Sequence, residues 1–379
     1  MRQRITAAAV RALAAAAAAG LRAARRGALF LWAPLLCAPL LCERSGAAEF
    51  PAPQAFDWIA RDFRFHGGEV MPELRLHYRT IGDPGGEPVL ILHGTSGSGA
   101  SLLTPAFAGQ LFGPGQPLDA RRYYIILPDA IGHGGSSKPS DGLRMKFPAY
   151  NYADMVAAQY RLVTEGLHLA HLRLVLGNSM GGMQVWIWGE AHPHRMDALV
   201  PMASQPGAMS SRNWMMRRLI VDSIRSDPDW HNGDYAEQPR SARFASTFFR
   251  IATSGGTLAW QKLAPTREAA DAVLNERLKA PFREDANDVL YAWESSGDYD
   301  PAPDLQRIEA PVLAINSADD ERDPPETGVM ARALTRIKTA RLLLIPASED
   351  TLGHSTTGLA RFWKDAFAAW LETVPHRHQ

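Results

Sequence analysis

One stretch, LRLVLGNSMGGMQVWIWGEA at residues 172–191, joins a run of apolar residues to a helical segment through a Gly-x-Ser-x-Gly turn. The turn places Ser179 between Gly177 and Gly181. A serine nucleophile that is raised on a tight strand-to-helix turn requires glycine at both positions, because a side chain there would collide with neighbouring backbone. The stretch therefore predicts a strand, a nucleophilic serine and a helix that begins directly after it.

Short apolar runs alternate with amphipathic helical segments along most of the chain. The runs predict strands at residues 73–82, 88–94, 123–129, 172–178, 197–204, 311–317 and 340–347. The later runs are almost continuous in Val, Leu and Ile, as expected for strands that are buried on both faces of a parallel sheet. Residues 152–169 and 358–374 are two of the helical segments. This alternation predicts an α/β fold with a doubly wound, mostly parallel sheet.

Residues 205–306 interrupt the alternation with helical stretches rich in Trp, Met and Arg. An insertion of this length between two core strands predicts a helical cap over the carboxyl edge of the sheet. We therefore divide the chain into a leader at 1–48, a core at 49–204, the cap, and a second core segment at 307–379. Most Met and aromatic side chains of the cap are expected to pack within it. Those that face the cleft, Trp214 among them, would line an apolar substrate pocket.

The N-terminal stretch differs in composition from the rest of the chain. Arg25 and Arg26 precede an apolar run at 27–42 that contains two prolines, and small residues follow at 45–48. A positive segment, a short apolar segment and a small-residue cleavage site are typical of a secretory signal peptide. The alternative is an uncleaved membrane anchor, although the run is short for a span. We expect a periplasmic or secreted protein with no stable membrane span after cleavage, while the start codon and the cleavage site stay open.

Composition argues against several classes of function. Lys plus Arg and Asp plus Glu number 40 each, so no basic field predicts a nucleic-acid partner and no acidic tail predicts a cationic one. The two cysteines, Cys37 and Cys42, both lie in the leader, so the mature chain would have neither a disulfide nor a thiol nucleophile. The sequence contains no metal-ligand cluster, phosphate-binding loop or dinucleotide fingerprint, and we predict no metal and no cofactor.

A serine nucleophile needs a base and an acid that orients the base. When the nucleophile lies on a strand–turn–helix motif of this kind, the acid and then the histidine follow it along the chain. His354 follows the last predicted strand, and Asp319 and Asp320 follow the strand before it. We favour Asp320 because its spacing to Pro324 matches the usual length of the acid-bearing loop. Asp319 and, behind it, Asp323 stay open as alternatives.

The oxyanion of an acyl-transfer intermediate needs two N–H donors that are already in place. The amide of Met180, directly after the nucleophile, is one predicted donor. The glycine-rich loop HGTSGSG supplies the other, with Thr95 as the first choice and Ser96 as the alternative. Two further histidines near this loop in the predicted fold, His93 and His133, are interpreted as structural residues.

Three stretches carry a resemblance to a known family: GNSMGGMQVWIWGEAHPHRMDALVPMASQP, IRSDPDWHNGDY and SARFASTFFR. With them the chain resembles the α/β-hydrolase superfamily from about residue 70 to about residue 370, and within it the homoserine O-acetyltransferases. The resemblance implies an α/β-hydrolase fold with a helical cap, in which Ser179, Asp320 and His354 form the catalytic triad. It also implies that Arg243 is placed to hold a substrate carboxylate.

Several features depart from the acetyltransferase pattern. The residue after the catalytic histidine, an Asp that binds the amino group of homoserine in that family, is Ser355 here. The tyrosine that follows the family's arginine is replaced by Phe248 and Phe249. Loss of a charge-assisted contact to an ammonium group removes selectivity for an amino-acid substrate. Export is a further departure, since acetyl-CoA and the synthesis of methionine precursors belong to the cytoplasm.

The sequence therefore predicts an exported serine hydrolase that cleaves an ester-type, small-molecule acyl substrate through a Ser-His-Asp triad and an acyl-enzyme intermediate. The alternative is an O-acyltransferase that moves an acetyl group from acetyl-CoA to an alcohol. An uncharged or weakly polar substrate is expected from the apolar cap, and a pocket lined mainly by Arg217, Arg218 and Arg243 would contradict this. The acyl group, the acceptor and the oligomeric state, with a homodimer as one option, stay open.

Overall fold

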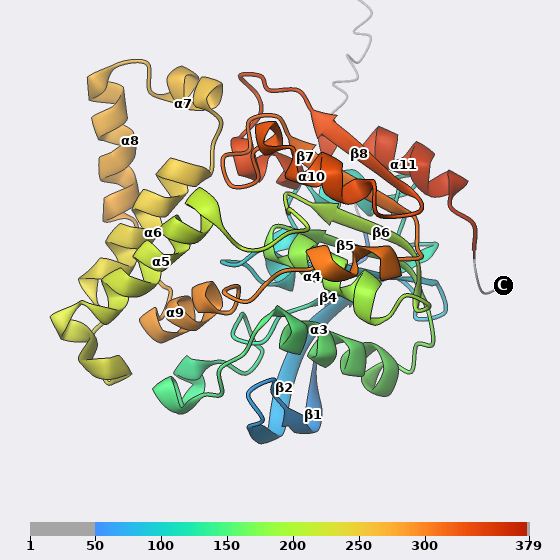
Figure 1. Ribbon diagram of the computed structural model, residues 1–379, viewed down its shortest axis with the longest axis horizontal. Coiled ribbons are helices and arrows are strands. Elements are labelled where there is room, and N and C mark those ends of the chain that lie inside the picture. Colours follow the sequence, from blue (N-terminus) through green and yellow to red (C-terminus); the bar gives the residue numbers. More distant parts are fainter. Residues whose placement is uncertain (1–49, 377–379) are drawn as a thin grey trace, which may run out of the picture. The chain divides into compact units, whose positions relative to one another are not determined.

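An eight-stranded sheet lies at the centre of the computed structural model, which describes residues 50–376 (Figure 1). The strands are β1 (Gln54–Arg64), β2 (Val70–Ile81), β3 (Glu87–Leu92), β4 (Tyr123–Pro128), β5 (Leu172–Asn178), β6 (Met196–Met202), β7 (Val312–Ser317) and β8 (Ala340–Ile345). Their order in the sheet is β1-β2-β4-β3-β5-β6-β7-β8. Strands β3 to β8 pair in parallel, whereas β2 is antiparallel to both β1 and β4. The predicted α/β fold with a mostly parallel sheet is confirmed.

The sequence analysis missed β1. This strand, QAFDWIARDFR, pairs only with β2 at the edge of the sheet, and most of its side chains are exposed or half-buried. Charged residues are interspersed among its apolar ones, so it lacks the continuous apolar run by which the buried strands were found. An edge strand needs no such run, because one of its sides faces solvent.

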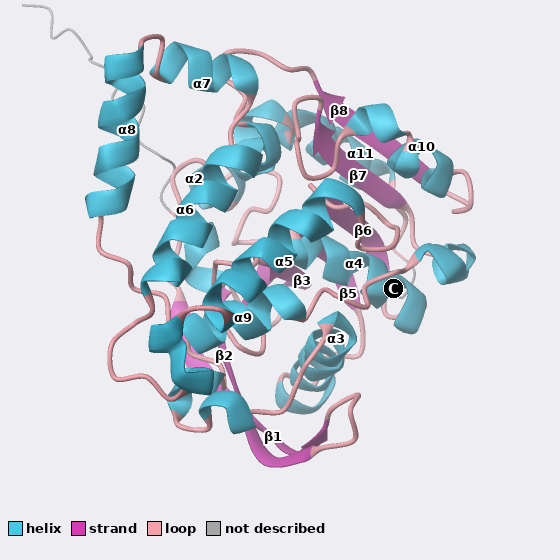
Figure 2. Cartoon of the chain, turned by 60° about the vertical axis from the view of Figure 1, so that its left-hand side comes forward, coloured by secondary structure: helices cyan, strands magenta, loops and turns pink. Residues whose placement is uncertain are grey.

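Helices cover both faces of the sheet (Figure 2). Along β3, Val89 and Ile91 pack on one face with α2 (Ala108–Leu111) and α11 (Lys364–Thr373), while Leu90 and Leu92 pack on the other. The helices of that second face are α3 (Tyr152–Arg161), α4 (Met180–Ala191) and α10 (Val329–Leu334). Burial on both faces explains why the central strands contain runs of adjacent apolar residues.

Five helices lie between β6 and β7 along the chain, within the region that we predicted as a cap. They are α5 (Ser211–Arg225), α6 (Arg240–Thr253), α7 (Thr257–Leu263), α8 (Arg267–Lys279) and α9 (Ala286–Glu294), and they gather beside the sheet at the left of Figure 1. A separate cluster of buried apolar side chains, including Trp230, Phe249 and Trp293, holds α5, α6 and α9 together. Other large apolar side chains of these helices, such as Met215 and Phe244, face solvent instead.

The N-terminal leader predicted at residues 1–48 lies outside the described part of the chain. Within residues 50–376, none of the helices has the length and the apolar character that crossing a membrane requires. The catalytic region that the sequence predicts lies wholly within the described residues.

Candidate active site

Ser179 lies between the end of β5 and the start of α4, in a strained backbone conformation with φ 56° and ψ −116°. Such a conformation costs a residue other than glycine about 1–3 kcal/mol. A Cβ atom on Gly177 would lie 2.3 Å from the carbonyl oxygen of Gly181, and one on Gly181 would lie 2.2 Å from the carbonyl oxygen of Leu92. The two glycines are therefore required by the close approach of backbone on both sides of the serine.

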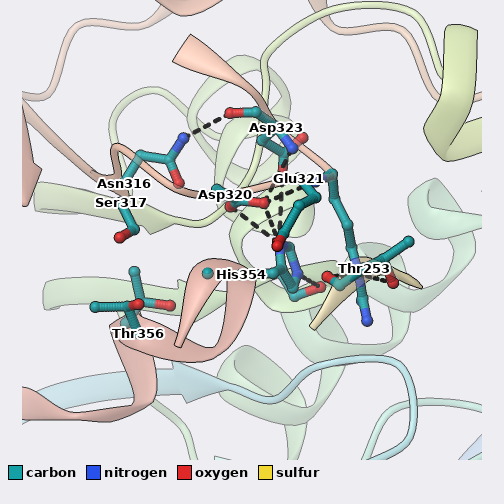
Figure 3. A network of polar contacts seen from close by, with 12 residues as sticks. Thr253, Asn316, Ser317, Asp320, Glu321, Asp323, His354 and Thr356 are labelled. Atoms are coloured by element: carbon teal, nitrogen blue, oxygen red, sulfur yellow. Dashed lines mark hydrogen bonds and ion pairs between the residues drawn. The ribbon is translucent and has the colours of Figure 1, made fainter. Parts of the chain in front are cut away.

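Two loops bring the other predicted residues to Ser179. His354 follows β8, and its Nε2 atom lies 2.8 Å from the Oγ of Ser179. Asp320 follows β7, and both of its carboxylate oxygens lie 3.0 Å from the Nδ1 of His354 (Figure 3). All three side chains are buried. This geometry allows the imidazole to take a proton from the hydroxyl while the carboxylate holds the ring in place.

The two alternative acids lie elsewhere in the network. The carboxylate of Asp319 accepts a hydrogen bond from the hydroxyl of Thr351 at 2.7 Å, and thereby holds the loop that precedes the histidine. Asp323 approaches the His354 Nδ1 only to 3.7 Å, and its Oδ2 has no hydrogen-bond partner among the described residues. Of the three aspartates, Asp320 alone has the geometry to orient the imidazole.

The environment of the pair supports an ionised acid beside a neutral base. Burial disfavours the charged form of Asp320, but His354 and two backbone N–H groups outweigh it, so the pKa of Asp320 lies below its ordinary value. Burial also lowers the pKa of His354 below 6.5, against the opposing effect of Asp320. Burial and the neighbouring Asp320 charge raise the pKa of Asp323 well above its usual range, against the opposing effect of Arg217 and Arg322.

Asp320, Asp323 and His354 also form the one group in the described part of the chain whose ligand atoms, all within 4.8 Å of one another, could surround a metal ion. The ring nitrogens of His354 already contact Asp320 and Ser179. The raised pKa of Asp323 also opposes the ionised form that binding a cation would require. We therefore assign this cluster to the serine site and not to a metal centre.

The glycine-rich loop after β3 passes directly beside the nucleophile. A Cβ atom on Gly94 would lie 3.5 Å from the Cβ of Ser179. Thr95 is buried and lines the same cavity as Ser179, and its hydroxyl has no hydrogen-bond partner among the described residues. Met180 is the first residue of α4, where backbone N–H groups have no partner within the helix. The structure thus places both predicted oxyanion donors next to the serine.

Two buried histidines, His93 and His133, make hydrogen-bond contacts in and beside this loop. The Nε2 of His133 lies 2.6 Å from the carbonyl oxygen of Thr95, and the Nε2 of His93 accepts a hydrogen bond from the amide of Ala130. Burial, together with His133, lowers the pKa of His93 to about 4. His93 is therefore neutral at pH 7, and the contacts of both rings agree with the structural role expected for them.

A cavity of about 1120 Å³ lies over Ser179, between the core and the helices that follow β6. Phe249, Trp260 and Trp293 supply its aromatic lining. The cavity also has a charged lining that the sequence analysis did not anticipate, formed by Arg250, Lys262, Arg277, Arg322, Arg361, Glu349 and Asp350. In the sequence, only the position of Arg322, two residues after Asp320, pointed to a charged residue at the cavity. That position does not reveal which way the side chain points.

The two substrate-binding residues predicted from the sequence do not line this cavity. Trp214 on α5 packs toward Gly297, where a Cβ atom would lie 3.2 Å from its ring. Arg243 on α6 donates a hydrogen bond to the carbonyl oxygen of Leu278 on α8 and lines a separate pocket of about 300 Å³. The face that each cap helix turns toward the cavity depends on its packing, so these two assignments are corrected in favour of Phe249 and Arg322.

Comparison with known proteins identifies the family. A family profile described as "alpha/beta hydrolase fold" matches residues 87–352. The chain belongs to the α/β-hydrolase fold family. A homoserine O-acetyltransferase of Caulobacter vibrioides (strain NA1000 / CB15N) is 30% identical over 327 residues, which are 81% of this chain and 81% of that protein. A second, from Thermobifida fusca (strain YX), is 35% identical over 191 residues, which are 46% of this chain and 49% of the relative, so the chain spans about half the length of that protein.

Solved structures share the fold of this α/β-hydrolase. The homoserine O-acetyltransferase from Bacillus anthracis aligns with a TM-score of 0.74 at 19% identity, over 86% of this chain and 99% of that one. An acetylester hydrolase from Corynebacterium glutamicum aligns with a TM-score of 0.72 at 20% identity, over 84% and 96%. A likeness at this level of identity shows the fold alone, and the fold accommodates both a transferase and an esterase.

Proposed function

We propose that this α/β-hydrolase is a serine hydrolase that cleaves an ester-type acyl substrate through an acyl-enzyme intermediate. The observation that carries the proposal is the continuous hydrogen-bonded series from the Ser179 hydroxyl through His354 to Asp320, with distances of 2.8 and 3.0 Å. A hydroxyl, an imidazole and a carboxylate in this order activate the hydroxyl as a nucleophile.

The mechanism follows from the position of each group. The Ser179 Oγ attacks the ester carbonyl carbon, and its proton passes to the Nε2 of His354, whose positive charge Asp320 stabilises. The amides of Met180 and Thr95 donate to the oxyanion of the tetrahedral intermediate. The intermediate collapses, and the alcohol leaves with the proton from His354. His354 then takes a proton from water, which attacks the acyl-enzyme and releases the carboxylic acid and the free serine.

Two features favour hydrolysis over transfer to homoserine. Ser355 lines the cavity directly after the histidine and carries no charge that could bind an ammonium group. Arg243, the arginine that would hold an amino-acid carboxylate, lies outside this cavity. The two contacts that the homoserine O-acetyltransferase pattern uses to select an amino acid are therefore missing at these positions.

An O-acyltransferase that uses acetyl-CoA and another alcohol is the second candidate. Similarity to a homoserine O-acetyltransferase over 81% of both chains favours it. Hydrolysis and transfer share the first half of the mechanism and differ in whether water or an alcohol attacks the acyl-enzyme. A site that performs transfer must exclude water while it holds the alcohol.

Release of p-nitrophenol from short acyl esters, with and without acetyl-CoA and a series of alcohols, tests the proposal. We expect steady turnover in water, which falls at least about 10³-fold in Ser179→Ala because the nucleophile is lost. Ser226→Ala, at an exposed serine after α5, is the matched control and should retain full activity. A single burst followed by turnover only when an alcohol is supplied would favour the transferase, and undiminished turnover in Ser179→Ala would contradict both.

We also propose that residues 1–48 direct export to the periplasm or the medium. The basic, apolar and small-residue segments in that order support this proposal. Fusion of residues 1–48 to a reporter phosphatase that is active only outside the cytoplasm should give activity, and replacement of Arg25 and Arg26 by glutamate should reduce it. Fusion protein that accumulates in the cytoplasmic fraction without phosphatase activity would contradict export.

A further inference from the structure

Arg322 is held at the wall of the cavity by uncharged groups. Its Nε donates to the hydroxyl of Thr253 at 3.1 Å, and its Nη2 donates to the hydroxyl of Ser254. The guanidinium carbon lies 4.4 Å from the centre of the Phe249 ring. The Nη1 amino group has no hydrogen-bond partner among the described residues, although the side chain lines the cavity that contains Ser179. The guanidinium is thus fixed in orientation and retains N–H groups that can bind a ligand.

Two arginines near the triad lack a carboxylate hydrogen-bond partner. Arg217, which is fully buried, bonds only to uncharged side chains, as Arg322 does. Burial, together with Arg217, lowers the pKa of Arg322 to about 9, so Arg322 is charged at neutral pH. A guanidinium without a carboxylate partner can pair with an anionic ligand.

The remaining charged lining is mostly positive. Lys262 is paired with Asp350 at 3.2 Å, and Arg250 with Glu284 at 2.9 Å. Two further arginines of the lining, Arg277 and Arg361, lie over the aromatic rings of Trp260 and Phe362. Since positive groups outnumber the two acidic ones in the lining, the cavity attracts anions. This lining supports a charged substrate in place of the uncharged one expected from the sequence. Arg217, Arg218 and Arg243, which the sequence analysis named as the arginines that would contradict that expectation, do not line the cavity.

We propose that the substrate is an ester that carries a carboxylate, in either its acyl chain or its alcohol portion, and that Arg322 binds this carboxylate through Nη1 and the remaining N–H of Nη2. The inference rests on the proposed esterase function of Ser179. A carboxylate supplies the negative partner that Arg322 lacks among its hydrogen bonds, and the planar fork of the guanidinium matches its two oxygens.

Two pairs of esters distinguish the possible positions of the carboxylate. Mono-(p-nitrophenyl) glutarate against p-nitrophenyl butyrate tests the acyl side, and 4-acetoxybenzoate against phenyl acetate tests the alcohol side. Each kcat/KM is divided by the rate with hydroxide alone, which removes intrinsic reactivity. We expect the anionic member of one pair to exceed the neutral member by at least about tenfold. No preference in either pair overturns the inference, while turnover of the neutral esters leaves the proposed function intact.

Variants at position 322 assign the preference to this side chain. In Arg322→Gln we expect the ratio of anionic to neutral kcat/KM to fall toward one, and Arg322→Lys should keep part of it. Arg218→Gln, an exposed arginine of α5 that pairs with Asp222, is the matched control and should leave the ratio unchanged. Thermal unfolding followed by circular dichroism verifies that each variant is folded. A ratio that survives in folded Arg322→Gln overturns the inference.

Binding to an inactive enzyme separates this inference from the proposed function. Calorimetric titration of Ser179→Ala with glutarate, and with 4-hydroxybenzoate for the alcohol side, measures carboxylate binding without turnover. We expect one of the two to bind, and the added Arg322→Gln change to weaken it about tenfold. Binding that depends on Arg322 in an enzyme whose wild type hydrolyses no ester would support the anion site and contradict the esterase. If neither acid binds, the inference of an anion site is overturned, while the proposed esterase function is not affected.

Discussion

The imidazole of His354 faces the hydroxyl of Ser179, with its Nε2 atom 2.8 Å from the Oγ. A base in this position acts only when it is neutral, so the protonation of one buried ring governs the rate. The hydrogen bonds that hold the ring in place come from Asp320 on the adjacent loop. The pH dependence and the identity of the acid are therefore the first properties to test.

The acidic limb of the pH profile should have its midpoint below pH 6.5. Burial lowers the pKa of His354 below that ordinary value, and the neutral ring is the active base, so kcat/KM rises with pH through the lowered pKa and then levels. The measurement is a profile of kcat/KM between pH 4.5 and pH 8 with a neutral ester. An acidic limb centred above pH 7 would show that a different group controls the rate.

The three aspartates of the acid loop should respond differently to replacement by asparagine. Asp320→Asn should lower kcat by about 10³–10⁴-fold, because the amide no longer stabilises the imidazolium or its tautomer. Asp323→Asn should lower kcat far less, since Asp323 lies 3.7 Å from the His354 Nδ1 and its raised pKa disfavours the charged carboxylate that the amide replaces. Comparison of kcat for the two folded variants shows which aspartate orients the imidazole of His354. Equal losses in both would mean that the two carboxyls act as one coupled pair.

Asp319→Asn should affect stability more than chemistry. Its carboxylate accepts from the Thr351 hydroxyl, a contact within the protein that a neutral amide oxygen can retain only in part. We expect a loss of about 1–2 kcal/mol in the free energy of unfolding with kcat changed only a few-fold. Urea unfolding and steady-state kinetics on the same preparation provide the check. A loss of activity as large as that of Asp320→Asn would return Asp319 to the triad.

Gly181→Ala should disrupt the turn that carries the nucleophile. The added methyl group would lie 2.2 Å from the carbonyl oxygen of Leu92, and backbone cannot move aside as a flexible side chain can. We expect a loss of at least about 1–3 kcal/mol in unfolding free energy together with a loss of activity. Gly115→Ala is a contrasting control. A Cβ atom at Gly115 would have no neighbour within 4 Å, but the residue has a positive φ, so this variant introduces backbone strain without crowding. Equal stability in the two variants would contradict the steric account.

Glu190 provides a test of stability against pH. Burial, and then Asp304, raise the pKa of this carboxyl on α4 from 4.5 to about 8, and its Oε1 has no partner among the described residues. The folded state therefore binds a proton that the unfolded state releases, so this contribution to stability is present below pH 4.5 and is lost as the pH rises through 8. Glu190→Gln should gain Tm relative to wild type between pH 5 and pH 8.5. The exposed Glu276→Gln is the control, and a pH-independent difference would contradict the account.

Much of the fold could be predicted because burial leaves a clear pattern. Strands such as β5 and β7 are apolar at nearly every position, which only a sheet covered on both faces requires. The edge strand β1 escaped notice because its side chains need not be apolar. Ser179, Asp320 and His354 each follow a predicted strand. Parallel strands bring the loops at their carboxyl ends to one edge of the sheet, so the sequence indicated that these three residues would meet there.

The substrate side of the site was harder to predict. Arg243 and Arg322 are both arginines near expected landmarks, but only the second lines the cavity. Which side of a cap helix or loop faces the cavity depends on contacts between segments distant in sequence, such as that between Arg322 and Phe249. Local sequence patterns do not contain this information, so the excess of positive charge over Ser179 became visible only in the structure.

The most direct test of the central claim is to trap the covalent intermediate. The protein is incubated with a fluorophosphonate, which mimics the tetrahedral intermediate and labels an activated serine, and the adduct is located by mass spectrometry of peptides. We predict one adduct, on Ser179, which is lost in Ser179→Ala and strongly slowed when His354 is replaced by alanine. A protein that takes up no label, or takes it up at a serine other than Ser179, would contradict the account.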